Sequence, residues 1–413
     1  MASHASRIPL PLAGLLALAV AMGIGRFAFT PVLPMMQADL GLSLSQGSWL
    51  ASANYLGYLL GALLVTHLPW PPATLLRLGL WTVMLTTAAM GLDSHWLGWM
   101  SWRLLAGMAS AWVLIGTSAL CIARLNATGQ TERSGVVFGG VGCGIAFAGL
   151  ACMGLTLAGT TASHAWLWLA AAALGGLLGA SMLWRTADVA APAATPAPAA
   201  STTPPLKAAA ASGSSHAAVR TAPPLHWGLI LCYGVYGFGY ILPATFLPAQ
   251  ARLLVPDPWL FSLAWPVFGL AAAVSTVISS RLSRRYTRPQ IWAGAQVVMA
   301  VGVLAPVLWH ALPAILLAAC CVGSTFMVIT MVGLQEAQAV VGQAGAKRQM
   351  AAMTASFALG QLIGPIFFSL THAWFGASLE FALVLGTLGL LAGVLPILRL
   401  GRPAAAVQPG GRQ

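Results

Sequence analysis

Charged residues are the scarcest feature of this 413-residue sequence. Only 6% of the residues are charged, and Asp and Glu together number seven, whereas 59% are hydrophobic and the mean hydropathy is +0.84. A soluble domain carries about 25% charged residues, so these few charges cannot cover a water-borne globule of this length. The composition excludes a soluble enzyme, a nucleic-acid-binding domain and a disordered chain. It indicates a membrane protein with many spans.

Patterns typical of metal, redox and phosphate sites are also lacking. The six cysteines all lie within apolar segments without a CxxC pair, so we interpret them as small core residues. The eight histidines are scattered, no HExxH occurs, and no glycine-rich phosphate loop with a lysine is present. We therefore expect no cofactor and no metal, and neither a membrane-embedded enzyme nor an ATP-driven pump.

Twelve apolar runs, each long enough to cross a bilayer as a helix, make up most of the chain. Between the sixth and the seventh lies a segment rich in Ala, Pro, Ser and Thr, which we predict to be a flexible linker. The expected fold is an all-α membrane protein with two pseudo-symmetric six-helix bundles, over 1–184 and 226–400, joined by the linker 185–225 and followed by a tail over 401–413. The predicted spans are 9–36, 49–68, 75–92, 96–124, 134–159, 165–184, 226–250, 259–280, 290–309, 313–340, 350–371 and 378–398.

The basic residues indicate the orientation of the chain. With the N-terminus inside, 16 of the 19 Lys and Arg residues fall in inner loops, tails or adjoining helix ends. Because cytoplasmic loops carry an excess of Lys and Arg, both termini and the linker are predicted to be cytoplasmic. The sixteen are Arg7, Arg77, Arg124, Arg133, Arg185, Lys207, Arg220, Arg281, Arg284, Arg285, Arg288, Lys347, Arg348, Arg399, Arg402 and Arg412.

The two halves of the chain repeat a short pattern. The residues GIGR at 23–26 are followed by Leu-Pro at 33–34, and GFGY at 237–240 is followed by Leu-Pro at 247–248. Two matches in the same order indicate a duplicated six-helix unit. Parallel repeats of this kind are a transporter architecture, in which the solute site lies at mid-depth between the halves.

Arg26 is the residue on which the functional interpretation depends most. It lies near the middle of the first span, where an arginine costs at least ~2.5 kcal/mol on insertion scales, so it must face a wet cavity or a partner. A structural arginine bonded to helix carbonyls and an arginine that contacts a substrate both fit the sequence. Gly23, Gly25, Pro31 and Pro34 would let this helix bend around a cavity.

Four further residues are candidates for the lining of that cavity. Asn54 and Tyr58 lie four residues apart, hence on one face of the second span. Tyr240 occupies the position in the second half that the arginine occupies in the first, and Gln361 lies in the eleventh span. For Asn54 and Tyr58, bonding between helices without a role in transport is an equal alternative.

Arg103 in the fourth span and Glu336 near the inner end of the tenth are candidate proton-coupling residues. Arg103 could instead snorkel to the outer interface, and Glu336 could be an end-of-helix residue rather than a protonatable gate. Glycines accompany the polar residues of spans two and four. Gly57 with Gly61 forms a GxxxG pattern that permits close helix contact, and Gly107 follows Arg103 by four residues.

The sequence resembles the major facilitator superfamily over nearly its whole length. The segment GIGRFAFTP at 23–31, followed by NYLGY at 54–58, is similar to the YbfB/YjiJ-like branch of that superfamily. The resemblance implies a twelve-helix transporter fold, a bacterial-type inner membrane and proton coupling. The Arg103–Gly107 pattern is similar to the superfamily's span-four motif, whose arginine is associated with proton coupling.

Two family patterns are incomplete in this chain. The acidic-basic motif between spans two and three is missing, since 65–77 offers only Arg77, and Gly144 in span five is followed by Ile145 rather than by proline. Drug-type proton antiport is therefore not implied by analogy.

Taken together, these observations predict a secondary active transporter that works by alternating access. No carboxylate lies at the depth of Arg26, so an anionic or zwitterionic organic solute is favoured over a cation. The expected partners are that solute, protons and the lipid bilayer, with no nucleic acid, and the chain is expected to be a monomer. A drug or sugar efflux antiporter and a non-transporting membrane sensor on the same scaffold are the alternatives.

Overall fold

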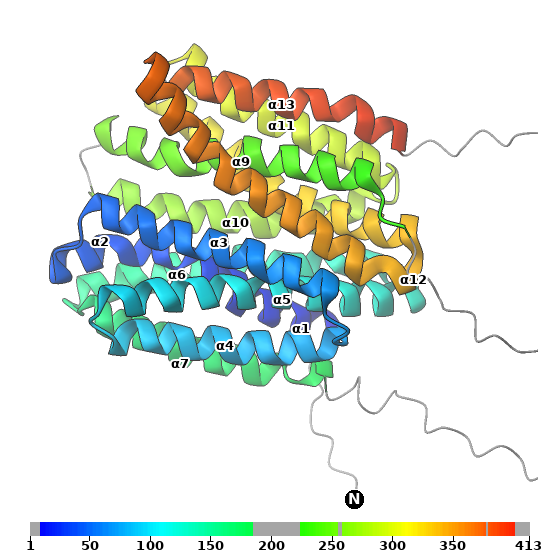
Figure 1. Ribbon diagram of the computed structural model, residues 1–413, viewed down its shortest axis with the longest axis horizontal. Coiled ribbons are helices and arrows are strands. Elements are labelled where there is room, and N and C mark those ends of the chain that lie inside the picture. Colours follow the sequence, from blue (N-terminus) through cyan, green and yellow to red (C-terminus); the bar gives the residue numbers. More distant parts are fainter. Residues whose placement is uncertain (1–8, 185–223, 255–257, 377–378, 401–413) are drawn as a thin grey trace, which may run out of the picture.

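The computed structural model describes residues 9–184, 224–254, 258–376 and 379–400, and these are almost entirely helical. The helices form two bundles. In Figure 1 α1–α7 occupy the lower part and α9, α10, α11 and α13 the upper part, while α12 runs obliquely from the upper left to the lower right. The predicted linker lies outside the described residues except for its last two positions, and the predicted tail 401–413 lies outside them as well.

The first half contains the following elements. The first span consists of three consecutive segments, α1 (Leu10–Leu18), the π-helix η1 (Ala19–Phe27) and α2 (Phe29–Leu40). The remaining elements are α3 (Leu44–His67), α4 (Pro72–Leu92), α5 (Trp96–Ala127), the short 3-10 helix η2 (Thr131–Arg133), α6 (Ser134–Leu157) and α7 (Ala162–Ala180). The second half contains α9 (Trp227–Leu254), α10 (Pro258–Leu282), α11 (Arg288–Leu308), α12 (Leu312–Phe375) and α13 (Leu379–Leu400).

Several helices begin at capping signals that the sequence carries. Ser43 caps α3 by accepting from the backbone N–H of Gln46, whose side chain accepts in return from the backbone N–H of Ser43. Thr287 and Gln290 form the same reciprocal arrangement at the start of α11. Each pair satisfies backbone donors that the first helical turn leaves free.

Eleven helices within the described residues are long and apolar enough to cross a membrane. One of them, the 55-residue stretch Pro313–Phe367 of α12, would extend roughly 80 Å as a continuous helix, more than twice the hydrocarbon core. Gly342 interrupts it with φ 70° and ψ 176°, a conformation that glycine adopts without the steric cost of a side chain. The break divides α12 into two crossings, which agrees with the twelve predicted spans. The loop expected between 340 and 350 is helical on both sides of Gly342.

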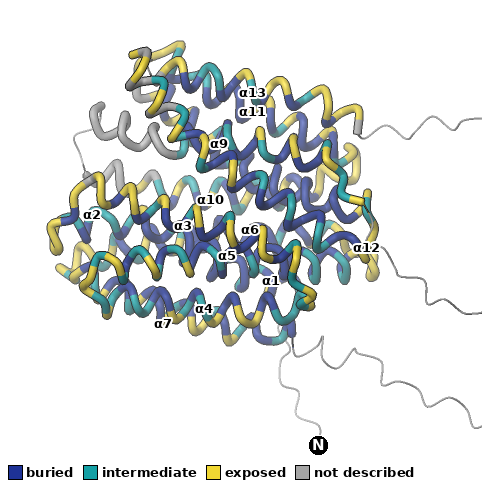
Figure 2. The backbone as a smooth tube through the Cα atoms, in the orientation of Figure 1, coloured by how far each residue is buried: buried dark blue, intermediate teal, exposed yellow. Residues whose placement is uncertain are grey.

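The two halves pack closely along α6 and α10 and along α3 and α12. On the first of these seams the backbones almost touch, because a Cβ on Gly142 would lie 2.4 Å from the carbonyl oxygen of Gly269. Small residues of this kind let helices approach closely within a bilayer. Figure 2 shows buried residues concentrated in the middle of the molecule, with exposed residues along its outer helices.

Candidate functional site

Arg26 lies in the π-helix η1, near the middle of the 31-residue span Leu10–Leu40. The side chain is buried, with 3% of the residue exposed. Pi-helical segments are uncommon, and they occur frequently at functional sites. Two glycines allow η1 to pack this tightly, since a Cβ on Gly23 would lie 2.4 Å from the Cα of Gly144 and one on Gly25 2.8 Å from Val83 Cγ1.

Aromatic rings surround the guanidinium of Arg26. Its Cζ atom lies 3.9 Å from the ring centre of Tyr58, 5.3 Å from that of Tyr55 and 5.6 Å from that of Phe27. Rings at these distances stabilise a cation through their quadrupoles. They provide no hydrogen-bond acceptor in the plane of the guanidinium, however, so the N–H groups still require partners.

Only one nitrogen of Arg26 finds such a partner within the described residues. Nη2 donates to Oε1 of Gln361, which lies on α12 in the other half of the molecule. Nε and Nη1 are buried without a hydrogen-bond partner, and none of the ion pairs of the described residues involves Arg26. A buried polar group left unsatisfied costs ~1–3 kcal/mol, and more when it is charged. The site is therefore chemically incomplete as it stands.

Arg103 on α5 stabilises η1 through hydrogen bonds to its backbone. Its Nη1 donates to the carbonyl oxygen of Gly25 at 3.2 Å and its Nη2 to that of Arg26 at 3.3 Å, while its Cζ lies 4.6 Å from the ring centre of Phe29. Only 3% of Arg103 is exposed, so it is buried rather than at an outer interface. Asn54 in turn donates to the carbonyl oxygen of Arg103 at 3.0 Å. Asn54 and Arg103 thus join α3, α5 and the first span.

The second half contributes a series of stacked rings to the same region. Consecutive ring pairs have centres 5.6, 5.2, 5.4 and 6.1 Å apart, with interplanar angles of 7°, 22°, 20° and 30°. Phe27 touches this series edge-on, 6.2 Å from Phe326 at 78°. We call the series the aromatic column, and in order it consists of Trp265, Phe268, Phe326, Tyr240 and Phe357.

Glu336 lies apart from this group, within the second half. It is buried, with 8% exposed, and its Oε2 lies 3.6 Å from Nη1 of Arg288 at the start of α11. Glu336 precedes the break at Gly342 by less than two helical turns. The structure therefore places it at the end of the first crossing of α12, close to the break, and does not bring it to Arg26.

The two halves are bridged at the end of the molecule where α1 begins and α13 ends, here called the terminus end. Glu132 in η2 pairs with Arg284, whose Nη2 lies 2.7 Å from Oε2, and this carboxylate raises the pKa of the Arg284 guanidinium. Lys347 donates across the same boundary to the carbonyl oxygens of Leu68 and Trp70, at 2.8 and 2.9 Å. These contacts close the terminus end between the halves.

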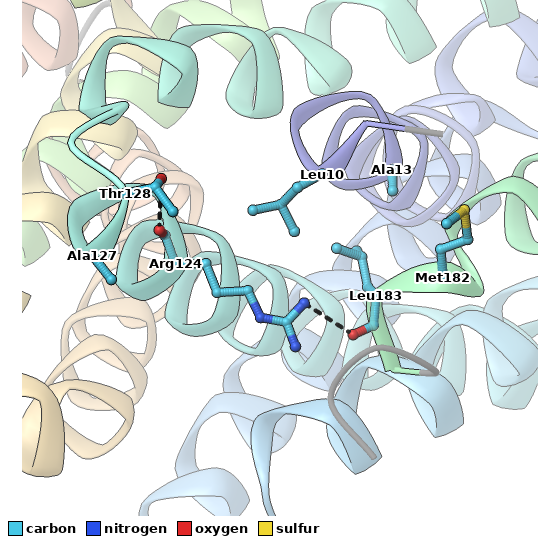
Figure 3. A pocket seen from close by; sticks show the side chains of 7 residues that line it. All are labelled: Leu10, Ala13, Arg124, Ala127, Thr128, Met182 and Leu183. Carbon is cyan, nitrogen blue, oxygen red and sulfur yellow. Dashed lines mark hydrogen bonds between the residues drawn. The ribbon is translucent and has the colours of Figure 1, made fainter. Parts of the chain in front are cut away.

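A separate pocket of 330 Å³ lies within the first half, also at the terminus end. Figure 3 shows Leu10 and Ala13 of α1 facing Arg124 of α5, whose Nη1 donates to the carbonyl oxygen of Leu183 at 3.5 Å. Leu10 precedes Arg26 by about 24 Å of helix. The lining is mostly apolar, and Arg26 is not among the residues that line the pocket.

The structure thus brings together some of the residues that the sequence singled out and separates others. Arg26, Tyr58 and Gln361 are in direct contact, Tyr240 lies within the aromatic column, and Asn54 and Arg103 support η1. Sequence reasoning did not name the other rings at the site. Tyr55 adjoins the predicted pair in span two, and Phe357 precedes Gln361 by one helical turn. Helical spacing from the predicted residues could therefore have identified these two rings. The missed rings are Phe27, Tyr55, Trp265, Phe268, Phe326 and Phe357.

Solved structures share this architecture. The human organic anion transporter MFSD10 (TETRAN) superposes with a TM-score of 0.65 at 15% identity, covering 94% of this chain and 98% of the other. The transporter FucP in its outward conformation superposes with a TM-score of 0.66 at 13% identity, covering 95% and 99%. At these identities the likeness shows the fold, which is that of a major facilitator transporter.

No curated protein matches the sequence. The family profile described as "Uncharacterised MFS-type transporter YbfB" matches residues 18–397, which includes both halves, η1 and every residue of the site. Its members are membrane transporters by that description. The chain therefore belongs to the YbfB-type family of the major facilitator superfamily.

Proposed function

We propose that this membrane transporter carries a small organic anion or zwitterion. The observation that carries the proposal is the buried guanidinium of Arg26, which has two unpartnered nitrogens and no ion-pair partner among the described residues. Charge in a low-dielectric site is poorly screened, so an organic cation would be repelled there. A carboxylate can accept hydrogen bonds from several N–H groups of one guanidinium, a geometry that lysine cannot reproduce.

The proposed mechanism is alternating access, in which the two halves rock about the site. The contacts at the terminus end support this mechanism because they are polar, and because the Glu132–Arg284 pair is exposed. The side chains of Glu132 and Arg284 are 39% and 69% exposed, so their pairing contributes little to stability and can separate readily. At mid-depth, Arg26 and Gln361 also belong to opposite halves, so their hydrogen bond must change when the halves move.

We infer that the terminus end faces the cytoplasm of a bacterial-type inner membrane. The sixteen basic residues assigned above to inner loops, tails and helix ends support this orientation. A reporter enzyme that is active only in the cytoplasm should therefore be active when it is fused after Gln413 or inserted near Ser214. Activity of a periplasm-specific reporter at either position would contradict the orientation.

We propose that transport is coupled to protons and that Glu336 and Arg103 take part in the coupling. Arg103 is connected to the site through its hydrogen bonds to the backbone of η1. Replacing Glu336 with glutamine removes the proton-binding carboxylate but keeps its size, so pH-driven accumulation of solute should be lost while solute exchange at equal pH persists. Transport into proteoliposomes with and without a pH gradient measures both. Normal accumulation by the variant would leave Glu336 as an end-of-helix residue paired with Arg288.

Counterflow in proteoliposomes tests the transport function itself. Vesicles preloaded with members of a metabolite library should take up a labelled carboxylate or amino acid, whereas lipophilic amines should support no counterflow. Uptake of amines in preference to acids would contradict the proposed solute class. Binding of a carboxylate without any flux would identify a sensor on this scaffold.

A further inference from the structure

The site points to a narrower solute class than organic anions in general. We propose that the solute is an aromatic carboxylate, bound with its carboxylate on Arg26 and its ring against Phe357 at the end of the aromatic column. This inference rests on the proposed function and adds the chemical nature of the solute's body.

A carboxylate reaches Arg26 along the plane of the guanidinium. The rings of Tyr58, Tyr55 and Phe27 lie 3.9, 5.3 and 5.6 Å from Cζ, and the N–H groups point outward in the guanidinium plane. Nη2 already donates to the amide oxygen of Gln361, whereas Nη1 and Nε have no partner. A carboxylate oxygen has the same acceptor geometry as that amide oxygen and adds a negative charge. We therefore place the carboxylate of the solute beside the Gln361 oxygen, on the nitrogens that lack a partner.

Phe357 lies beside that position. Gln361 and Phe357 are four residues apart on α12, so their side chains share one helix face about 6 Å apart along its axis. A solute whose carboxylate binds beside the Gln361 oxygen has its body next to Phe357. The Phe357 ring lies at 30° to Tyr240 and at 33° to Tyr236, with centres 6.1 and 5.0 Å away. A planar ring can extend this stack, whereas a saturated ring cannot present a π-face.

A second buried donor lies in the same region. The indole Nε1 of Trp265, at the opposite end of the aromatic column, is buried and has no hydrogen-bond partner within the described residues. The Trp265 ring centre lies 6.4 Å from that of Phe27, and the Cζ atom of Arg26 lies 5.6 Å from the same ring. Trp265 and Arg26, each with unsatisfied donors, thus adjoin the same ring. Both are suited to the acceptor oxygens of a bound acid rather than to a cation.

The test compares three probes that differ in one property each. Phenylacetate has the charge and the ring, cyclohexylacetate has the charge with a saturated ring, and phenylacetamide has the ring without the charge. With purified protein in lipid nanodiscs, calorimetry should show phenylacetate binding about two- to tenfold tighter than cyclohexylacetate, the size of effect that aromatic pairing produces. Phenylacetamide should bind most weakly of the three.

Variants assign the preference to Phe357. Phe357→Leu should bring the ratio of the two acid affinities close to one, and Phe357→Tyr should keep it. Phe147→Leu, which changes an exposed ring on α6, is the matched control and should leave the ratio unchanged. Thermal unfolding of each variant establishes that it is folded, and if Phe357→Leu does not fold, the wild-type ratio together with Phe357→Tyr decides.

The outcomes separate this inference from the function on which it rests. Equal binding of the two acids by the wild-type protein would overturn the aromatic class and leave an anion site. Binding of neither acid but of the amide would overturn the anion site itself. A preference for phenylacetate that survives Phe357→Leu in a folded protein would overturn the assignment of the ring position.

Discussion

Replacing Arg26 with alanine should abolish the binding and counterflow of carboxylate solutes. The guanidinium is the buried cation of the site, and its loss leaves an anion to be transferred into a low-dielectric region without a counter-charge. An affinity loss of at least 100-fold is expected, since a charge-assisted contact that is removed from a buried site costs ~3 kcal/mol or more. Equilibrium binding and counterflow of the purified variant provide the measurements.

Arg26→Lys distinguishes a binding role from a structural one. Lysine keeps the charge but presents a point donor in place of a planar fork, so binding should weaken markedly while the yield of folded protein stays near normal. In a purely structural role, Arg26→Ala would lower the thermal unfolding temperature and leave the solute affinity per folded molecule unchanged. Unchanged affinity in Arg26→Ala would end the anion-site hypothesis.

Replacing Gly57 with alanine should produce the largest loss of stability. A Cβ at this position would lie 1.9 Å from the backbone carbonyl oxygen of Leu104, so α3 and α5 would have to separate. On the facing helix, a Cβ on Gly107 would lie 2.0 Å from the carbonyl oxygen of Asn54, so the contact is equally close from both sides. Overpacking typically costs 1–3 kcal/mol, and because backbone atoms cannot repack we expect about 3 kcal/mol or more.

Gly154→Ala on α6 is the control for this substitution. Nothing lies within 4 Å of a Cβ at Gly154, and alanine favours a helix over glycine by about 1 kcal/mol. The control should therefore unfold at the wild-type temperature or slightly above it, whereas Gly57→Ala should unfold at a markedly lower temperature or fail to yield monodisperse protein. Similar unfolding temperatures for the two variants would show that the two helices separate easily.

The order of the spans, and a count consistent with the structure, could be predicted from the sequence because a bilayer selects for long apolar runs. The repeat of 23–26 at 237–240 likewise predicted two related bundles. The glycines at 57 and 61 indicated that the second span can approach another helix closely, but not that this helix is α5. The break at Gly342 could not be predicted in detail. From sequence, a short polar loop between two helices cannot be distinguished from a helical run that a single left-handed glycine interrupts. We therefore expected a loop between 340 and 350.

Arg26 could be singled out because a charge within a span is costly and therefore informative. Its hydrogen bond to Gln361 depends on how two helices 335 residues apart are aligned, which no local pattern records. The same holds for the aromatic column, whose rings come from α9, α10 and α12. Glycine and proline near Arg26 indicated that the first span can bend, but not that Ala19–Phe27 form a π-helix. The hydrogen-bond register of that segment depends on packing against neighbouring helices.

The unpaired guanidinium of Arg26 also has an electrical consequence. A unit charge that crosses the whole membrane field changes in free energy by about 2.3 kcal/mol per 100 mV, and a charge near mid-depth experiences part of that field. In the proposed cycle the empty site carries one positive charge, while the site loaded with a monovalent acid carries none. Membrane voltage then acts mainly on the unloaded protein, so the return of the empty carrier is the voltage-dependent step of transport.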